Sequence, residues 1–179
     1  KYRADYIFEN LQIQNNLIFG SHLSNVKKLI FLGSSCIYPK NCSQPMKEEN
    51  LLSGYLEPTN EPYAIAKISG IKLCESLKYQ YNRDYRSLMP TNLYGINDNF
   101  DLQNSHVIPA LIKKFHEAKV KNKRKVTVWG SGKIFRDFLY VDDLANAILK
   151  IFNMKKNDYE KLIKGVSHLN IGSGKQITI

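Results

Sequence analysis

The fold is decided by the stretch Lys28-Leu-Ile-Phe-Leu-Gly33, which is followed at once by Ser34-Ser-Cys-Ile-Tyr-Pro39. A short continuous apolar run of this kind is typical of a parallel strand that is buried on both faces of its sheet. The residues after it then stand at the carboxyl end of the strand. Open α/β sheets bind their ligands at this edge, so the stretch predicts both a sheet and a site beside it.

Helix-like and strand-like segments alternate on both sides of this strand. Apolar spacing predicts a helix over residues 4–19, and Pro62 begins a second helical pattern that continues to Tyr81. Together they predict an α/β fold with a doubly wound, Rossmann-like parallel sheet. The other expected elements are strands at 85–89, 126–129 and 168–171 and helices at 107–120 and 141–152.

The composition excludes some classes of protein. No apolar run approaches the ~20 residues that cross a bilayer, so no membrane partner is expected. The net charge is +10, but the densest basic run, Lys119–Lys125, holds one Arg and no aromatic residue, which favours a solvated face over nucleic-acid binding. The three cysteines are odd in number and lack zinc-ligand spacing, which favours a reducing, cytoplasmic compartment and no metal site.

Two Gly-Ser-Gly-Lys sequences, at Gly130–Lys133 and Gly172–Lys175, invite comparison with a phosphate-binding loop. That loop needs a Gly five residues before its second glycine and a Ser or Thr after its lysine, and neither sequence has them. Both are therefore predicted to be turns. The Gly-x-Gly-x-x-Gly fingerprint of dinucleotide-binding folds is also absent from the sequence.

Tyr63 and Lys67 lie four residues apart at the start of the second helix, so both project from one helix face. We expect the Lys67 ammonium to favour the phenolate and lower the pKa of Tyr63 from about 10. By itself the spacing is more often a surface pair. The hydroxyl groups of Ser34 and Ser35, expected beside this helix, can hydrogen-bond a substrate carbonyl and so favour a catalytic role.

Ser, Tyr and Lys in this order resemble the nucleotide-sugar branch of the extended short-chain dehydrogenase/reductase superfamily. Longer motifs are similar to the GDP-L-fucose synthase family, and the similarity runs through essentially the whole chain. The resemblance implies an NADP(H)-dependent enzyme that epimerises GDP-4-keto-6-deoxy-D-mannose at C3 and C5 and reduces it at C4. The motifs are Phe31-Leu-Gly-Ser-Ser-Cys-Ile-Tyr-Pro-Lys40, Leu56-Glu-Pro-Thr-Asn-Glu-Pro-Tyr-Ala-Ile-Ala-Lys67, Met89-Pro-Thr-Asn-Leu-Tyr-Gly95 and Asn104-Ser-His-Val-Ile-Pro-Ala110.

The resemblance also implies a role for individual residues. Tyr63 would exchange the proton of the carbonyl oxygen, Ser34 would hold that oxygen, and Lys67 would contact the cofactor ribose. Cys36 would be the epimerisation base and His106 its partner acid. The implied cofactor-binding residues are Leu32, Gly33, Ser34, Ser35, Lys67, Pro90, Thr91, Asn92, Leu93 and His106. The implied substrate-binding residues are Lys114, Trp129 and Arg136.

Cys36 and His106 also have ordinary structural interpretations. A lone Cys after a strand is usually a small core residue, and a lone His is usually a cap or a surface group. Both match the family motifs in register, which favours the catalytic interpretation. Lys114 stands where the family pattern has an Arg, so it keeps the charge but not the bidentate geometry.

The resemblance predicts that the chain is a fragment that lacks both ends of the enzyme, including the glycine fingerprint. Residues 1–104 are expected to be the remainder of the NADP-binding domain, with the catalytic residues. Residues 105–179 are expected to contribute to the substrate domain and the last sheet strands. The fragment alone is expected to be inactive, and the whole enzyme to be a cytoplasmic homodimer that acts on a nucleotide sugar.

Two other functions stay open. One is another nucleotide-sugar enzyme of the superfamily, a 4-epimerase or a dehydratase, which would need no essential thiol. The other is a non-catalytic relative that binds a nucleotide sugar. The joint presence of Ser34, Cys36, Tyr63, Lys67 and His106 argues against the second.

Overall fold

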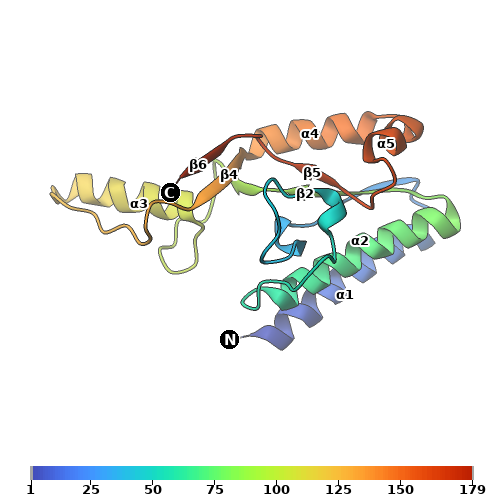
Figure 1. The fold of residues 1–179 in the computed structure, drawn as a ribbon, viewed down its shortest axis with the longest axis horizontal. Helices are drawn as coiled ribbons and strands as arrows, with labels where there is room; N and C mark the ends of the chain where they lie inside the picture. Colours follow the sequence, from blue (N-terminus) through green and yellow to red (C-terminus); the bar gives the residue numbers. More distant parts are fainter. Residues whose placement is uncertain (1, 179) are drawn as a thin grey trace. The chain divides into compact units, whose positions relative to one another are not determined.

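A computed structural model of the chain describes residues 2–178 (Figure 1). They fold into two compact units: the first consists of the chain up to Thr91 together with Asn146–Ile171, and the second of Asn92–Ala145 together with the residues from Gly172 onward. The elements in chain order are α1 (Arg3–Leu23), β1 (Lys28–Leu32), the 3-10 helices η1 (Ser35–Ile37) and η2 (Glu48–Asn50), α2 (Glu61–Tyr81), β2 (Asp84–Pro90), β3 (Asn92–Tyr94), α3 (Val107–Val120), β4 (Phe135–Tyr140), α4 (Val141–Asn153), α5 (Lys156–Ile163), β5 (Leu169–Ile171) and β6 (Gln176–Thr178).

The first unit is built on a parallel sheet with the strand order β1-β2-β5. In this sheet Phe31 of β1 lies opposite Ser87, and Met89 of β2 lies opposite Asn170 of β5. Helices α1 and α2 lie side by side on one face, and α5 with the part of α4 that belongs to this unit covers the other face (Figure 1). A parallel sheet covered by helices on both faces confirms the predicted doubly wound, Rossmann-like fold.

Apolar side chains fill a core on each face of this sheet. The core under α1 and α2 includes Phe31, Ile71 and Met89, and the core under α4 and α5 includes Leu88 and Ile163. Successive side chains of a strand point to opposite faces, so the neighbours Leu88 and Met89 enter different cores. This double burial explains why Leu29–Leu32 of β1 reads as a continuous apolar run, whereas β2 is buried although it contains Arg86 and Ser87.

Helix α2 approaches strand β1 closely because Gly70 faces Phe31. A methyl group at position 70 would overlap the Phe31 ring, so a larger residue would push the helix away from the sheet. Beside Gly70, the buried Gln14 side chain of α1 also contacts α2 and donates a hydrogen bond to the Ala66 carbonyl oxygen at 2.5 Å. These contacts fix the first turns of α2 beside the carboxyl end of β1.

The second unit holds a smaller sheet, in which β4 is parallel to β3 and antiparallel to β6. The Asp137 side chain accepts hydrogen bonds from the backbone N–H and the hydroxyl of Ser173, at 3.1 and 2.7 Å, and from the Gly174 N–H at 3.2 Å. Gly172–Lys175 is therefore a bend that leads into β6. Gly130–Lys133 also lies outside the helices and strands, which confirms that both sequences are turns.

The strand predicted at 126–129 is wrong. The backbone there is irregular, and the Val128 side chain is 47% exposed. Two alternating valines imitate a strand in the sequence, but a strand forms only where it can pair, and the partner of β3 is β4 instead. The other predicted helices and strands are confirmed, with their ends shifted by a few residues.

The predicted domain boundary between residues 104 and 105 falls inside the second unit. The chain passes from the first unit to the second after Thr91, returns to the first at Asn146 and enters the second again at Gly172. The assignment of the two segments to domains of a whole protein stays a prediction, because compactness within this chain does not test it. Among residues 2–178, none of the helices combines the length and the apolar character that a membrane span needs.

Candidate active site

The turn that follows β1 carries the thiol of Cys36. Ser34 is extended, with φ −155° and ψ 149°, and precedes the 3-10 helix η1. Its hydroxyl oxygen accepts a hydrogen bond from the backbone N–H of Cys36 at 3.3 Å, as serine does at the start of many helices. Ile37 and Tyr38 at the end of η1 are buried, and Cys36 itself is half-buried. The sequence thus anchors the turn at both ends and leaves the thiol partly accessible.

Tyr63 in the first turn of α2 reaches the same place. Its hydroxyl is hydrogen-bonded with the Ser34 side chain, and the Cys36 thiol lies close enough to act on it electrostatically. Burial raises the pKa of Tyr63, and proximity to Cys36 adds to that effect, whereas the hydrogen bond from Ser34 opposes it. The structure therefore brings together three of the predicted catalytic residues: a phenol, a hydroxyl and a thiol.

The expectation that Lys67 lowers the pKa of Tyr63 is wrong in this structure. The Lys67 ammonium donates a hydrogen bond to the Leu32 carbonyl oxygen at 3.1 Å. It lies 5.6 Å from the centroid of the Tyr63 ring and 5.2 Å from that of Phe31, over the rings rather than at the hydroxyl. Burial lowers the pKa of Lys67 itself. Tyr63 consequently keeps its proton near neutral pH and is suited to act as an acid.

The predicted cofactor residues of the first unit gather where three parallel strands end. Gly33 continues β1 with a hydrogen bond from its N–H to the Leu88 carbonyl oxygen at 2.9 Å, and Thr91 at the end of β2 donates to the Ile171 carbonyl oxygen at 3.0 Å. A methyl group at Gly33 would overlap the sulfur and the terminal methyl of Met89, so the buried Met89 side chain would have to shift. The remaining predicted cofactor residues of this unit are Leu32, Ser34, Ser35 and Pro90 at the same strand ends and Lys67 on α2.

The second unit carries the other predicted residues. Asn92 and Leu93 lie on β3, and His106 is the exposed residue that precedes α3. Lys114 of α3 places its ammonium 4.6 Å from the ring centroid of Trp129, whose side chain is 85% exposed. Lys114 and Trp129 are therefore in contact, and their role in binding the substrate stays a prediction.

The remaining predictions concern Arg136 and the pairing of Cys36 with His106. Arg136 on β4 is exposed and donates to the Phe135 carbonyl oxygen at 3.1 Å. Cys36 and His106 belong to different compact units, so their pairing as base and acid stays a prediction.

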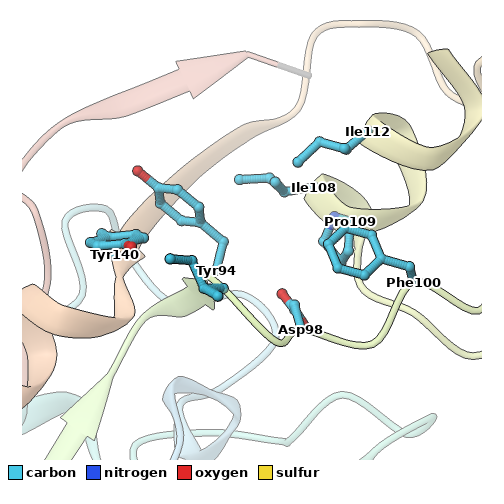
Figure 2. Close-up of a pocket in the computed structure, with 9 residues that line it drawn as sticks. Tyr94, Asp98, Phe100, Ile108, Pro109, Ile112 and Tyr140 are labelled. Carbon is cyan, nitrogen blue, oxygen red and sulfur yellow. The ribbon is translucent and has the colours of Figure 1, made fainter. Parts of the chain in front are cut away.

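A pocket of about 260 Å³ lies in the second unit, between the loop after β3 and helix α3 (Figure 2). Its lining is mostly apolar, and the ring centroids of Tyr94 and Tyr140 are 5.5 Å apart at one side of it. None of the predicted site residues lines this pocket. Its lining residues are Tyr94, Gly95, Ile96, Asp98, Phe100, Ile108, Pro109, Ile112 and Tyr140.

Residues 1–172 match the NAD dependent epimerase/dehydratase family. The chain belongs to this family. It is 56% identical over 179 residues to the GDP-L-fucose synthase of Escherichia coli (strain K12), a match that covers 99% of this chain and 56% of that protein. It is 41% identical over 175 residues to the GDP-L-colitose synthase of Yersinia pseudotuberculosis, covering 97% of this chain and 54% of that protein. The chain thus spans about half the length of the curated relatives it matches.

A solved structure of a similar protein supports the fold assignment. The crystal structure of a GDP-D-glycero-L-gluco-heptose synthase from Campylobacter jejuni in the presence of NADPH superposes with a TM-score of 0.91 at 39% sequence identity. This match covers 99% of the present chain and 62% of the other. The epimerase/dehydratase fold is therefore shared across nearly all of the chain.

Sequence reasoning missed one group of residues beside the site. Tyr38, two positions after Cys36, is buried against His168 and Asn170 of the β5 segment, and it hydrogen-bonds both. His168 and Asn170 are two positions apart and so lie on one strand face, but the sequence does not reveal that this face meets Tyr38 from 130 residues away.

Proposed function

We propose that the chain is the catalytic part of an NADP-dependent GDP-L-fucose synthase, which converts GDP-4-keto-6-deoxy-D-mannose to GDP-L-fucose. The observation that carries this proposal is the meeting of Ser34, Cys36 and Tyr63 at the carboxyl end of β1. A plain carbonyl reductase needs the two hydroxyls, whereas the thiol adds a base that can act on carbon. The 56% identity to the Escherichia coli enzyme supports the same substrate.

Epimerisation is possible because the 4-keto group acidifies the hydrogens at C3 and C5, whose removal leaves an enolate. Cys36, as the thiolate, takes the proton, and the Ser34 and Tyr63 hydroxyls stabilise the charge on the enolate oxygen. His106, as the imidazolium, returns a proton to the opposite face of the carbon. Each inversion leaves a thiol and a neutral imidazole, which exchange protons with solvent before the next one.

Reduction then acts on the same carbonyl. NADPH, held by Lys67 and the backbone of residues 90–93, would supply a hydride to C4. Tyr63 donates its proton to O4 as negative charge develops there, while Ser34 holds the oxygen. The raised pKa of Tyr63 keeps the phenol protonated before the reaction and makes it a ready proton donor.

The hydrogen-bond donors of the first unit are suited to a nicotinamide cofactor. An ammonium group has three N–H donors, and the hydrogen bond to the Leu32 carbonyl oxygen takes one of them at Lys67. Lys67 can thus bind the hydroxyls of a ribose. The backbone of residues 90–93 would line the nicotinamide side, and Gly33 leaves the end of β1 free of a side chain.

For the GDP part of the substrate, the proposal assigns Lys114, Trp129 and Arg136. Trp129 exposes an indole face, and Lys114 lies over its ring. The Arg136 guanidinium is exposed and can form paired hydrogen bonds with a diphosphate. The net charge of +10 adds a general attraction for such an anion.

The similarity to a GDP-L-colitose synthase favours a second candidate, the reduction of a different GDP-linked 4-keto sugar. The test is NADPH oxidation by the whole gene product with GDP-4-keto-6-deoxy-D-mannose and with other 4-keto nucleotide sugars. We expect turnover with the first and GDP-L-fucose as the product. Turnover only with another 4-keto nucleotide sugar would show that the proposed substrate is wrong. NADPH binding without any turnover would favour a non-catalytic relative.

The cytoplasmic location and the homodimeric state are parts of this proposal. Sedimentation of the whole gene product checks the second of them, since a homodimer has twice the mass of one chain.

A further inference from the structure

A buried hydrogen-bonded chain ties the turn that carries Cys36 to strand β5. The Tyr38 side chain is 4% exposed, and its hydroxyl donates to the Asn170 side-chain oxygen at 2.5 Å. The same hydroxyl lies 2.7 Å from Nε2 of His168, which is 0% exposed. Asn170 is held in turn, because its backbone N–H donates to the Glu48 carboxylate of η2 at 2.8 Å. Four polar groups from three parts of the first unit thus form one network.

The hydrogen bonds of this network define the proton positions. The Asn170 amide nitrogen donates to the Met46 carbonyl oxygen at 3.3 Å, which orients its oxygen toward Tyr38. The single hydroxyl proton of Tyr38 therefore goes to Asn170, and the phenol oxygen accepts from Nε2–H of His168. Nδ1 of His168 then accepts from the Ser167 hydroxyl at 3.0 Å. A neutral imidazole satisfies every one of these bonds.

This network fixes the end of the turn after Cys36, and the Ser34 hydroxyl fixes the end before it. Tyr38 follows η1 directly and is two residues from Cys36, while the Ser34 hydroxyl binds the Cys36 N–H at the start. Hydrogen bonds on both sides of Cys36 therefore hold the backbone that carries the thiol. Asn170 also pairs with Met89, whose sulfur packs over Gly33. Strand β5 therefore supports the turn from its beginning to its end.

Two of the groups that serve reduction, Tyr63 and Lys67, are anchored elsewhere. Tyr63 and Lys67 belong to α2, which is fixed against α1 and β1 by the packing at Gly70 and Gln14. Removing the Tyr38 hydroxyl would leave these contacts in place. It would leave buried polar groups of Asn170 and His168 without their partner and so loosen the turn at Cys36.

We propose that Tyr38, held by His168 and Asn170, is a positioning residue that sets the place of the Cys36 thiol and so governs epimerisation more strongly than reduction. The proposal rests on the proposed function. Proton removal from carbon needs the base at contact distance, and a misplacement of about 1 Å can cost about 100-fold in rate.

The test uses Tyr38→Phe in the whole gene product, with Tyr85→Phe as the matched control. Tyr85 is also 4% exposed, lies in the same core and donates one hydrogen bond, to the Val26 carbonyl oxygen at 3.2 Å. Exchange of the C3 and C5 hydrogens with deuterium oxide, without cofactor, reports epimerisation alone. The proportion of directly reduced, unepimerised GDP-6-deoxyhexose among the products reports the balance between the two steps.

We expect Tyr38→Phe to slow the deuterium exchange about tenfold or more and to raise the unepimerised product, with Tyr85→Phe close to the wild type. His168→Gln keeps an N–H donor toward Tyr38 and should retain more epimerisation than His168→Leu. If Tyr38→Phe loses epimerisation and reduction equally, Tyr38 has only a general structural role and the proposal is overturned. No change in either activity would also overturn it.

Backbone amide exchange separates this proposal from the proposed function. If Tyr38 positions the turn, the amides of residues 35–37 exchange faster in Tyr38→Phe than in Tyr85→Phe, whatever the substrate is. Unchanged protection there would overturn the positioning role. A wild-type protein without deuterium exchange on the sugar would instead overturn the proposed function, while the amide measurement would still decide the role of Tyr38.

Discussion

Lowering the pH from 7 to 5 is expected to cost the folded protein about 2 kcal/mol of its free energy of unfolding through one side chain, His168. The imidazole is 0% exposed, and burial lowers its pKa from 6.5 to about 4, against an opposing effect of the nearby Glu48 carboxylate. Its two ring nitrogens are already engaged by Tyr38 and Ser167. A second ring proton on the folded protein would therefore break an existing hydrogen bond.

The direction of the effect follows from which state binds the proton. Between pH 6.5 and pH 4 the unfolded chain protonates this imidazole while the folded protein does not, so a falling pH favours unfolding. At about 1.4 kcal/mol for each pKa unit, the whole shift of His168 is worth about 3 kcal/mol. The cost is almost absent at pH 7 and is complete below pH 4. The charges of Lys72, Glu75 and Glu49 act on the same ring with smaller effects.

Urea unfolding followed by circular dichroism at pH 7, 6 and 5 measures this cost. Carboxylates also titrate at low pH, so the comparison needs His168→Gln, which keeps an N–H toward Tyr38 but does not titrate. Between pH 7 and pH 5 the wild type should lose about 2 kcal/mol more than this variant. Equal losses in the two proteins would refute the assignment of a neutral, buried His168.

Four further substitutions test the site and its support. Cys36→Ser should slow deuterium exchange at C3 and C5 at least about 100-fold while NADPH oxidation continues, and full GDP-L-fucose turnover would instead favour a 4-epimerase or dehydratase. Tyr63→Phe should lower kcat for NADPH oxidation by about 10²–10⁴ and slow that deuterium exchange to a smaller extent, because Ser34 still donates to the enolate oxygen, so a kcat within about twofold of the wild type would contradict its role as proton donor. Gly33→Ala should destabilise the protein in urea by about 1–3 kcal/mol, because the added methyl overlaps Met89. Gly20→Ala, in a helix with nothing within 4 Å of the new methyl, should stabilise it by about 0.5–1 kcal/mol, and the same sign for both would contradict the packing argument.

The doubly wound sheet could be predicted because its strands are buried on both faces and its helices carry clear apolar spacing. Lys28–Leu32 shows this in the sequence itself, whereas Asp84–Pro90 is buried although it includes Arg86 and Ser87. The smaller sheet could not be predicted in the same way. Its strands β3 and β6 have three residues each, and exposed positions are common in it, so no apolar run reveals them.

The proximity of the candidate residues could be predicted from the sequence, whereas their electrostatics could not, and their catalytic roles stay a prediction. The motifs placed Ser34, Cys36 and Tyr63 together, and the structure confirms that they meet. Spacing along a helix fixes which face Lys67 shares with Tyr63, but not the depth of burial or the place where the ammonium lies. Those two quantities reversed the expected change in the pKa of Tyr63.

The most direct test of the account is the isotopic composition of the product formed in deuterium oxide. The whole gene product would be given GDP-4-keto-6-deoxy-D-mannose and unlabelled NADPH. The account predicts GDP-L-fucose with deuterium at C3 and C5, because His106 returns solvent-derived protons there, and with ordinary hydrogen at C4, because the cofactor supplies it. A reduced product with ordinary hydrogen at C3 and C5 would contradict the central claim that the Cys36 site inverts both carbons before reduction.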